Sequence, residues 1–491
     1  MTTSIDPNEG RGRAQRVGRW LGPAVFAAML ALAPLQQVMP DPAWRAAAAG
    51  LWMAIWWATE AIPVPATALL PLVIFQPLGI ADIRAVAAPY AHPTIFLFLG
   101  GFVMALALER WNLHRRIALA ILDKTGTEGR RLIGGFMLVS ALLSMWMTNT
   151  STTMMLLPIV LSVIAVMRDN VAGVDDTQQD HFRLALLLGL AYAASIGGLA
   201  TLIGTPPNAL LIGYLAERHG LEISFARWML LGIPVTALLL PVAWWLLTAR
   251  LFPVNIGSSD AVRAHLQRMR IEQGPLSIPE RRVAIVFACL VAGWMLRRPL
   301  QAITGMTDLS DTAIAMAAAV ALFLLPSGDR DQRALMRWDD TARLPWGVLV
   351  LFGGGLSLAS AVDASGLALW LGESLAPLNA LGVGVLLLAA VALTIFLTEL
   401  TSNMATTATL LPVMGAIALQ AGLPPLLLTV PVTLAASCAF MLPVATAPNA
   451  IVFSTGTLKI GQMVRAGIWL NLLAIAIIWI IGRYAAPALL V

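Results

Sequence analysis

Two short polar stretches decide how this chain folds: Ser144–Thr153 (SMWMTNTSTT) and Thr398–Thr407 (TELTSNMATT). We call them the first tip and the second tip. Each lies within an apolar run of about 35 to 40 residues, although roughly 20 apolar residues suffice for one helical crossing of a bilayer. This length predicts re-entrant hairpins over about 132–167 and 380–420, each turning at its tip. Because non-helical backbone survives at membrane depth only beside protein or a watery cavity, each turn also predicts a cavity.

The two tips belong to an internal repeat. The segment Leu99–Pro158 aligns without a gap with Gly353–Pro412. Asn149 then matches Asn403, because 149 and 403 differ by the constant offset of 254. Apolar low complexity aligns Leu with Leu by chance, but it does not readily align Asn, Thr, Pro and Gly in one order. Duplicated halves with a binding site between them are typical of secondary transporters.

A break containing proline follows each tip, at Gly204–Asn208 (GTPPN) and Ala445–Asn449 (ATAPN). The two breaks are 241 positions apart, so the first half holds 13 more residues before its break, for which the polar loop 168–183 has room. Proline interrupts the helical hydrogen-bond ladder, so we predict broken helices over about 184–214 and 423–455. A helix that restarts after a break presents amide hydrogens and a positive dipole end, which suit an anion. A simple proline kink is the alternative, and its recurrence at paired positions disfavours it.

Each tip is rich in neutral oxygen ligands. Ser144 and Thr148 are four residues apart, as are Thr398 and Ser402, and this spacing places two hydroxyls on one helix face. Such oxygens are what unwound transporter segments offer to sodium. Hydrogen bonding between packed membrane helices is the alternative, and it would explain one isolated tip better than two equivalent ones. Neither the tips nor the breaks contain Lys, Arg or His, so a bound cation would help to neutralise an anion held there.

Composition places the chain in the membrane class. Of its 491 residues 59% are hydrophobic and 12% are charged, and that charged fraction is about half of what a soluble domain carries. We count about ten or eleven apolar runs long enough to cross a bilayer. The predicted fold class is therefore an all-α polytopic membrane protein. Cys289 and Cys438 lie in apolar runs and predict neither a disulfide nor a metal site.

Basic residues predict the orientation. The formal charge of +5 does not indicate nucleic-acid binding, since membrane chains gather Lys and Arg in cytoplasmic loops. We expect residues 1–19 to form a cytoplasmic N-terminal tail, and the first apolar run to be kept rather than cleaved. The basic stretch 110–131 is also expected in the cytoplasm, as is the linker 253–282 between the first repeat half (20–252) and the second (283–491). The expected location is the cell inner membrane.

No catalytic constellation stands out, and the phosphate-binding pattern GxxxxGK[ST] is missing from the sequence. We therefore predict a carrier driven by an ion gradient rather than an enzyme. Glu399, whose counterpart in the first half is Met145, is expected to accept backbone hydrogen bonds at the hairpin, with tuning of a sodium site as the alternative. Glu60, Glu109 and Asp363 are expected near helix ends, paired with arginines.

These motifs resemble the divalent-anion/sodium symporter family, which includes sodium-coupled dicarboxylate and citrate carriers. The Ser-Asn-Thr motifs at that family's hairpin tips look like Thr148-Asn149-Thr150 and Ser402-Asn403-Met404. The broken helices and the segment Thr59–Pro63 look like the family too, so the resemblance spans nearly the whole chain. It implies about eleven transmembrane helices plus two re-entrant hairpins in two inverted repeats. It also implies a scaffold domain that forms a homodimer and a transport domain that moves as an elevator.

The resemblance further implies two sodium sites around one substrate site. Thr148 keeps the hydroxyl of the family's Ser, whereas Met404 loses that of Thr and Ala447 stands where the family often has proline. The implied sodium ligands are Ser144, Thr148, Asn149 and the Gly204 carbonyl in the first half, and Thr398, Ser402, Asn403 and the Ala445 carbonyl in the second. The implied substrate-binding residues are Asn149, Thr150, Thr152, Thr205, Ser402, Asn403, Met404, Thr406, Thr446 and Ala447.

The expected function is secondary active transport of C4-dicarboxylates such as succinate, malate or fumarate, with Na⁺ as coupling ion and no organic cofactor. The expected partners are the substrate, sodium, the lipid bilayer and a second copy of the chain, without nucleic acid. A sodium-independent dicarboxylate exchanger and a carrier of another anion, such as sulfate or arsenite, are the alternatives. An intramembrane enzyme is a third, for which no nucleophile–base pair or metal ligands are seen.

Overall fold

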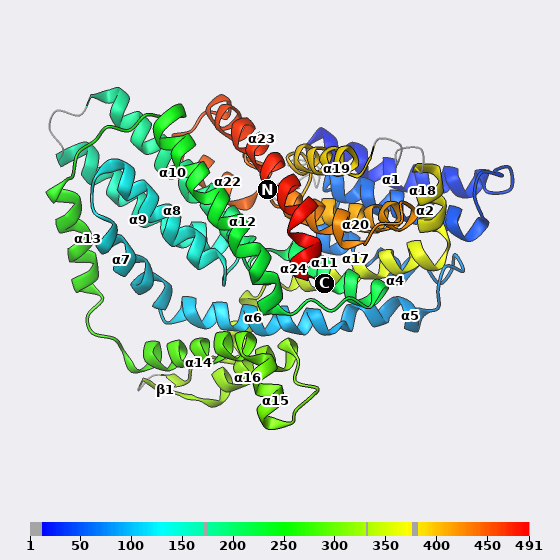
Figure 1. Cartoon of the computed structure of the whole chain (residues 1–491), viewed down its shortest axis with the longest axis horizontal. Coiled ribbons are helices and arrows are strands. Elements are labelled where there is room, and N and C mark those ends of the chain that lie inside the picture. Colours follow the sequence, from blue (N-terminus) through cyan, green and yellow to red (C-terminus); the bar gives the residue numbers. More distant parts are fainter. Residues whose placement is uncertain (1–11, 171–174, 330–331, 376–381, 491) are drawn as a thin grey trace, which may run out of the picture.

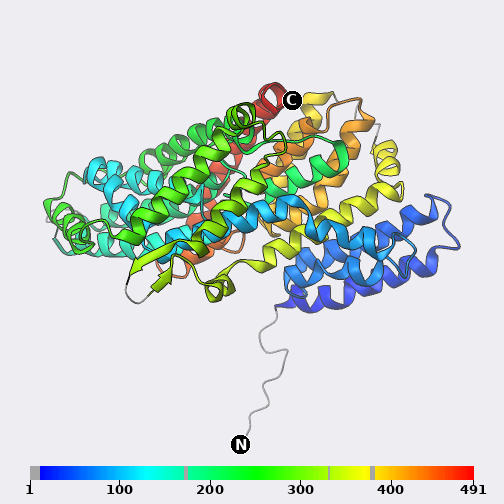
Figure 2. The same ribbon diagram turned by 90° about the horizontal axis from the view of Figure 1, so that it is seen from below.

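The computed structural model describes residues 12–170, 175–329, 332–375 and 382–490. Among these residues the structure is helical apart from connecting turns and one antiparallel ribbon (Figure 1). The ribbon pairs β1 (Pro326–Asp329) with β2 (Gln332–Ala334). The first elements are α1 (Arg13–Leu32), α2 (Asp41–Thr59), α3 (Val64–Thr67), α4 (Leu70–Ile74), α5 (Ile83–Ala87) and the 3-10 turn η1 (Ala88–Ala91). Figure 2 shows α1 and α2 packed together at one end of the long axis.

The first half of the repeat continues with two entry helices, a hairpin and a broken helix. Its elements are α6 (Pro93–Arg110), α7 (Leu113–Thr125), the hairpin of α8 (Gly129–Ser144) and α9 (Asn149–Asn170), the broken helix of α10 (Asp176–Gly198) and α11 (Pro206–His219), and α12 (Phe225–Trp245) with its π-helical extension η2 (Leu246–Leu251).

The second half has the same elements in the same order. They are α17 (Trp346–Ala364), α18 (Leu367–Leu375), the hairpin of α19 (Val383–Thr398) and α20 (Asn403–Gln420), the broken helix of α21 (Leu426–Ala436) and α22 (Ala447–Phe453), and α23 (Ile460–Tyr484), followed by α24 (Ala486–Leu490). The hairpins lie toward opposite ends of the long axis, with their tips between them (Figure 1).

The sequence suggested that a loop over 168–183 holds the extra residues of the first half. The structure does not contain such a loop over most of this range. Helix α9 runs on to Asn170 and α10 begins at Asp176, so most of that stretch is helical. Helix α10 has 23 residues where its counterpart α21 has 11. The insertion therefore lengthens the first part of the broken helix.

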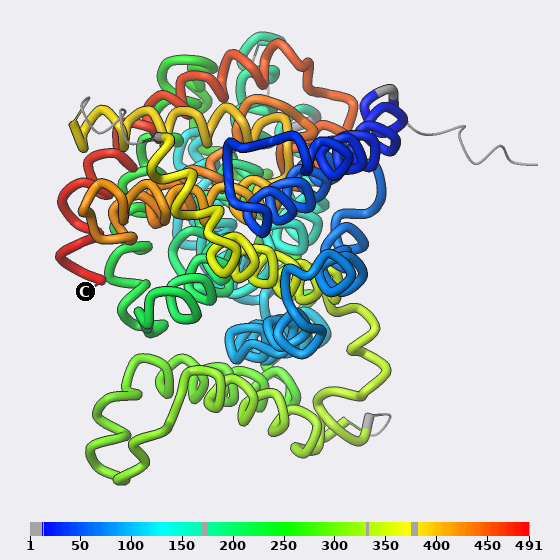
Figure 3. Tube along the Cα trace, turned by 90° about the vertical axis from the view of Figure 1, so that its right-hand side faces the viewer, coloured from blue at the N-terminus to red at the C-terminus, as the bar shows by residue number. Residues whose placement is uncertain are grey.

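The remaining helices lie in the chain between α12 and α17. They are α13 (Asp260–Glu272), α14 (Ile278–Met295), α15 (Arg297–Thr304), α16 (Asp311–Leu324) and the 3-10 turn η3 (Trp338–Arg343). Helix α13 packs against α7 and α9, apart from the others (Figure 1). Helices α14 and α16 contact α6, which lies between them and the rest of the chain (Figures 1 and 3).

The described residues contain six helices that are long and apolar enough to cross a membrane, or seven when the bent pair α14–α15 is taken as one span. The six are Ile83–Arg110, Asn149–Arg168, Asp176–Gly198, Phe225–Leu251, Trp346–Ala364 and Ile460–Tyr484. Shorter apolar helices, such as Asp311–Leu324 and Leu426–Ala436, lie beside them. The expected all-α membrane fold with two hairpins is confirmed.

Candidate functional site

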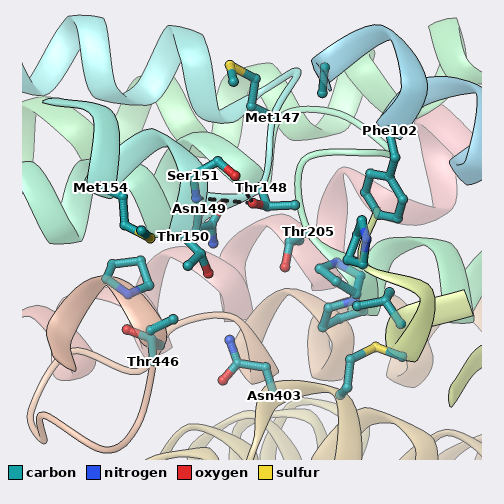
Figure 4. A pocket seen from close by; sticks show the side chains of 18 of the residues that line it. Phe102, Met147, Thr148, Asn149, Thr150, Ser151, Met154, Thr205, Asn403 and Thr446 are labelled. Carbon is teal, nitrogen blue, oxygen red and sulfur yellow. Dashed lines mark hydrogen bonds between the residues drawn. The ribbon is translucent and has the colours of Figure 1, made fainter. Parts of the chain in front are cut away.

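Both tips and both breaks face one cavity of about 600 Å³. In Figure 4, the side chains of Thr150, Thr205, Asn403 and Thr446 surround the same central space. The remaining wall comes from α6, the end of η3 and the start of α17, which contribute Phe102, Ala105, Leu106, Glu109, Arg343, Pro345 and Val348. The cavity is thus lined from one side by the repeated polar motifs and from the other by helices outside them.

The first tip places an amide among oxygens. Helix α8 ends at Ser144 and α9 begins at Asn149, leaving Met145–Thr148 as the turn. One end of the Asn149 amide lies within hydrogen-bond distance of three oxygens: Ser144 Oγ at 2.6 Å, the Ala194 carbonyl at 3.1 Å and the Gly204 carbonyl at 3.2 Å. With nitrogen at this end, the two amide hydrogens are shared among these three acceptors. With oxygen there, four neutral oxygens face one another, which is a ligand set for a hard cation.

Glycine allows this close packing. A Cβ atom added at Gly204 would lie 2.6 Å from the Gly198 carbonyl oxygen and 2.9 Å from that of Ser144. A Cβ at Gly198 would lie 2.7 Å from Asn149 Oδ1. Only glycine therefore lets the first break approach the first tip so closely.

The second tip repeats the arrangement with different groups. Thr398 Oγ1 lies 2.9 Å from Asn403 Oδ1 and 2.8 Å from the carbonyl oxygen of Ala436, so it occupies the place that Ser144 has in the first tip. Ser402 Oγ caps α20 by accepting from the Ala405 amide at 3.1 Å. Thr148 Oγ1 accepts in the same way from the Ser151 amide at 3.2 Å. A hydroxyl that caps a helix keeps a second lone pair, which remains available to an ion.

An asparagine holds each break in shape. Asn208 Nδ2 donates to the carbonyls of Gly198 and Thr201 at 3.3 and 2.8 Å. Asn449 Nδ2 donates in the same way to Ala439 and Leu442, at 3.2 and 3.0 Å. These bonds fix the unwound segments, so that Thr205 and Thr446 begin the next helices at the cavity wall. Both asparagines lie in the predicted breaks, but this role is not predicted from the sequence.

Helix N-termini supply positive potential to the cavity. Helices α9, α11 and α20 all begin at lining residues. The helix dipole makes such ends favourable for anions, and unpaired amide hydrogens add to it at α9 and α20. Helix α11 begins with Pro206 and Pro207, which have no amide hydrogen, so it contributes mainly through its dipole. The cavity can therefore attract a carboxylate without a lysine or arginine at the tips.

Most of the predicted site residues come together here. The predicted residues that line the cavity are Thr148, Asn149, Thr150, Thr205, Ser402, Asn403, Met404, Ala445, Thr446 and Ala447. Ser144, Gly204 and Thr398 do not line it and lie behind the tips, which suits ion ligands. Thr152 and Thr406, predicted to bind substrate, are buried and do not line the cavity either; Thr406 Oγ1 hydrogen-bonds Thr401 Oγ1 at 2.6 Å. The geometry gives no support to a substrate contact at these two threonines.

Sequence reasoning missed the wall opposite the tips. Glu109 was expected only to pair with an arginine near a helix end, and its partner is Arg343, at the end of η3. Asp363 likewise pairs with Arg218, whereas Glu60 ends α2 with a left-handed backbone (φ 48°) and has no ion pair within the described part of the chain. Nothing in the sequence connects residue 109 with residue 343, because neither belongs to the tips or the breaks.

Glu399 is buried and ties the second tip to the second break. Its carboxylate accepts hydrogen bonds from the backbone amides of Phe440, Met441 and Leu442 at 2.7, 2.9 and 3.0 Å. Asn471 Nδ2 of α23 donates to it at 2.7 Å. Glu399 was predicted to accept backbone hydrogen bonds at the hairpin. It does accept backbone hydrogen bonds, but their donors belong to the neighbouring broken helix.

Comparison with known proteins shows the family of the chain. The family model described as the sodium:sulfate symporter transmembrane region matches residues 15–491. The chain belongs to this family. The sodium-dependent dicarboxylate transporter SdcS of Staphylococcus saprophyticus is 40% identical over 492 residues, covering 98% of this chain and 93% of the relative. SdcS of Staphylococcus aureus strain USA300 is 39% identical over 483 residues, covering 97% and 92%.

Solved structures of other transporters share the fold. The YdaH transporter of Alcanivorax borkumensis superposes with a TM-score of 0.56 at 16% identity, covering 90% of this chain and 98% of its own. MtrF of Neisseria gonorrhoeae superposes with a TM-score of 0.53 at 13% identity, covering 95% and 97%. At such low identity the likeness concerns the fold alone. Membership of the sodium:sulfate symporter family shows that the chain is a membrane transporter and not an enzyme.

Proposed function

We propose that the chain is a sodium-coupled symporter of small dicarboxylates, with C4 acids such as succinate, malate and fumarate as substrates. One observation carries the proposal: both tips and both breaks face a single cavity in which they present only uncharged side chains. A dianion bound there needs compensating positive charge at low dielectric. Sodium ions held behind the tips supply it, and the names of the SdcS relatives point to the same ion and the same substrate class.

The two halves divide the work of binding. Sodium enters first, at the oxygens around Asn149 and at those around Asn403, and draws each amide into the orientation that a substrate carboxylate requires. The substrate then binds in the cavity, where Thr150, Thr205 and Thr446 offer hydroxyls to it. Because charge is neutralised only when ions and anion are bound together, the partly loaded site is unfavourable. Sodium and substrate therefore move together.

The proposal includes alternating access of the elevator type. Thr201 Oγ1 donates to the Met145 carbonyl and ties the first break to the first tip, and Glu399 ties the second tip to the second break. The hydroxyls of Thr205 and Ser437, 3.3 Å apart, link the two halves, so the tips and breaks form one block. Helices α6 and α17 form the opposing wall. Sliding of the block along that wall would carry the loaded site from one side of the membrane to the other. A cytoplasmic N-terminus and a homodimeric scaffold are parts of this proposal that remain predictions.

Uptake of radiolabelled succinate into proteoliposomes tests the proposal. An inward sodium gradient should drive accumulation above the external concentration, and an equal potassium gradient should not. Equal uptake in both would rule out sodium coupling. Uptake that depends on internal dicarboxylate would favour the exchanger instead. Sodium-driven uptake of radiolabelled sulfate, without uptake of succinate, would favour the inorganic anion.

A further inference from the structure

The wall opposite the tips carries an ion pair between Arg343 and Glu109. Glu109 lies in the last turn of α6, and Arg343 is the last residue of η3. Among the described residues that line the cavity, these two are the only ones with charged side chains. Any anion in the cavity therefore shares it with one fixed positive and one fixed negative group.

The two partners are unequally covered. The side chain of Arg343 is 60% exposed and that of Glu109 is 23% exposed. An ion pair with so much solvent contact contributes little to stability, so stability alone does not account for it. A guanidinium has five N–H donors, and Arg343 Nη2 is the atom that donates to Glu109. Arg343 thus keeps donors that can bind a second carboxylate in the bidentate fashion typical of arginine.

The backbone that carries Arg343 is well held. Trp346 Nε1 donates to the Thr341 carbonyl at 2.9 Å, which links η3 to the start of α17. Trp111 Nε1 donates to the Leu335 carbonyl at 2.9 Å, and Arg110 pairs with Asp340, so η3 is also fastened to the end of α6. The backbone of Arg343 is therefore held at the cavity wall, and the ion pair with Glu109 orients its guanidinium there.

We propose that Arg343 selects doubly charged substrates by binding one of their carboxylates at the wall of the cavity, with Glu109 positioning the guanidinium until the substrate arrives. This inference rests on the proposed dicarboxylate function and deepens it. The tips offer only neutral groups and helix ends. These bind one carboxylate, but they distinguish only weakly between a ligand with one carboxylate and a ligand with two. A guanidinium on the opposite wall binds the second carboxylate and so favours the doubly charged ligand. In the rival explanation, Arg343 only cancels the charge of Glu109.

Transport kinetics of Arg343→Gln in proteoliposomes test the selection. For succinate, the Michaelis constant should rise roughly 10-fold or more, as expected for loss of a charge-assisted hydrogen bond, with a smaller change in turnover. Inhibition of succinate uptake by its monomethyl ester, which carries one charge, should stay within about twofold, because that ligand needs no second cation. The matched control is Arg337→Gln, a nearby exposed arginine that pairs with Asp339 and does not line the cavity. Arg337→Gln should leave unchanged both the Michaelis constant for succinate and the inhibition constant of the monomethyl ester.

The double variant separates the two explanations. If Arg343 binds substrate, Glu109→Gln combined with Arg343→Gln should remain as weak for succinate as Arg343→Gln alone. Recovery of the wild-type constant in the double variant would overturn the proposal and show that Arg343 only neutralises Glu109. An unchanged constant in Arg343→Gln would overturn it too. Because every comparison uses a wild type that transports succinate, failure of the inference is distinct from failure of the proposed function, in which the wild type itself shows no succinate uptake.

Discussion

Asn149 and Asn403 occupy equivalent places at the starts of α9 and α20, and each amide contacts the hydroxyl that ends the preceding helix. In the proposed mechanism, replacing either asparagine with alanine removes a group shared by ion and substrate. We expect sodium-driven succinate uptake to fall by about 10- to 100-fold in each variant, as for loss of a hydrogen bond to a charged partner. Unfolding temperatures without ligand should stay close to wild type. The measurement is initial uptake rate at saturating sodium.

Thr409 provides the matched control for these two variants. Its hydroxyl bonds the Ala405 carbonyl inside α20 at 2.9 Å, and it does not line the cavity. Thr409→Ala should transport normally. If the Asn149 and Asn403 variants transported as well as Thr409→Ala, these asparagines would have to be removed from the site.

At the scale of elements, Glu399 is a chemical difference between the two tips of the repeat. Its counterpart Met145 offers a backbone carbonyl, to which Thr201 Oγ1 donates, where Glu399 offers a carboxylate to three amides. Glu399→Ala would leave those amides buried without partners, so we expect a loss of about 2–5 kcal/mol in stability. Glu399→Gln keeps a hydrogen-bond acceptor and should lose less stability than Glu399→Ala. Thermal unfolding in detergent measures both.

The exposed Glu373 of α18 is the control, because Glu373→Ala removes the same side chain without opening buried hydrogen bonds. Sodium dependence of uptake distinguishes the two roles expected for Glu399. A Glu399→Gln variant with lower stability but an unchanged sodium requirement supports the structural role. A shifted sodium requirement with unchanged stability would instead assign Glu399 to tuning of the ion site.

The repeat made these elements predictable from sequence, whereas the opposing wall was not predictable. Asn, Thr and Pro at matched positions inside apolar runs carry a signal that chance does not reproduce, and it led to the tips, the breaks and the residues that converge on the cavity. Glu109 and Arg343 carry no such signal, because a charge at a helix end is common and their contact spans 234 positions. Thr152 and Thr406 were included because they lie near the tips, but helical geometry turns them away from the cavity.

At the scale of the whole molecule, binding of sodium and succinate should raise the free energy of unfolding. A ligand that binds only the folded chain stabilises it in proportion to the logarithm of its concentration over Kd, about 2.7 kcal/mol at a hundredfold excess. We expect sodium to raise the unfolding temperature and potassium to have no effect. Succinate should raise it further only when sodium is present, because the anion needs the ion's charge. Equal stabilisation by succinate in potassium would contradict the coupled site.

The shared cavity also has a consequence for how the protein is made. A ribosome delivers the first tip about 250 residues before the second tip and nearly 300 before the second break, so Asn149 and its oxygens enter the translocon long before their partners exist. During that interval a polar turn must wait in the bilayer or stay outside it. We therefore expect the first hairpin to take its final depth late, after residue 449 has emerged, and chains truncated before that point to be targets for membrane proteases.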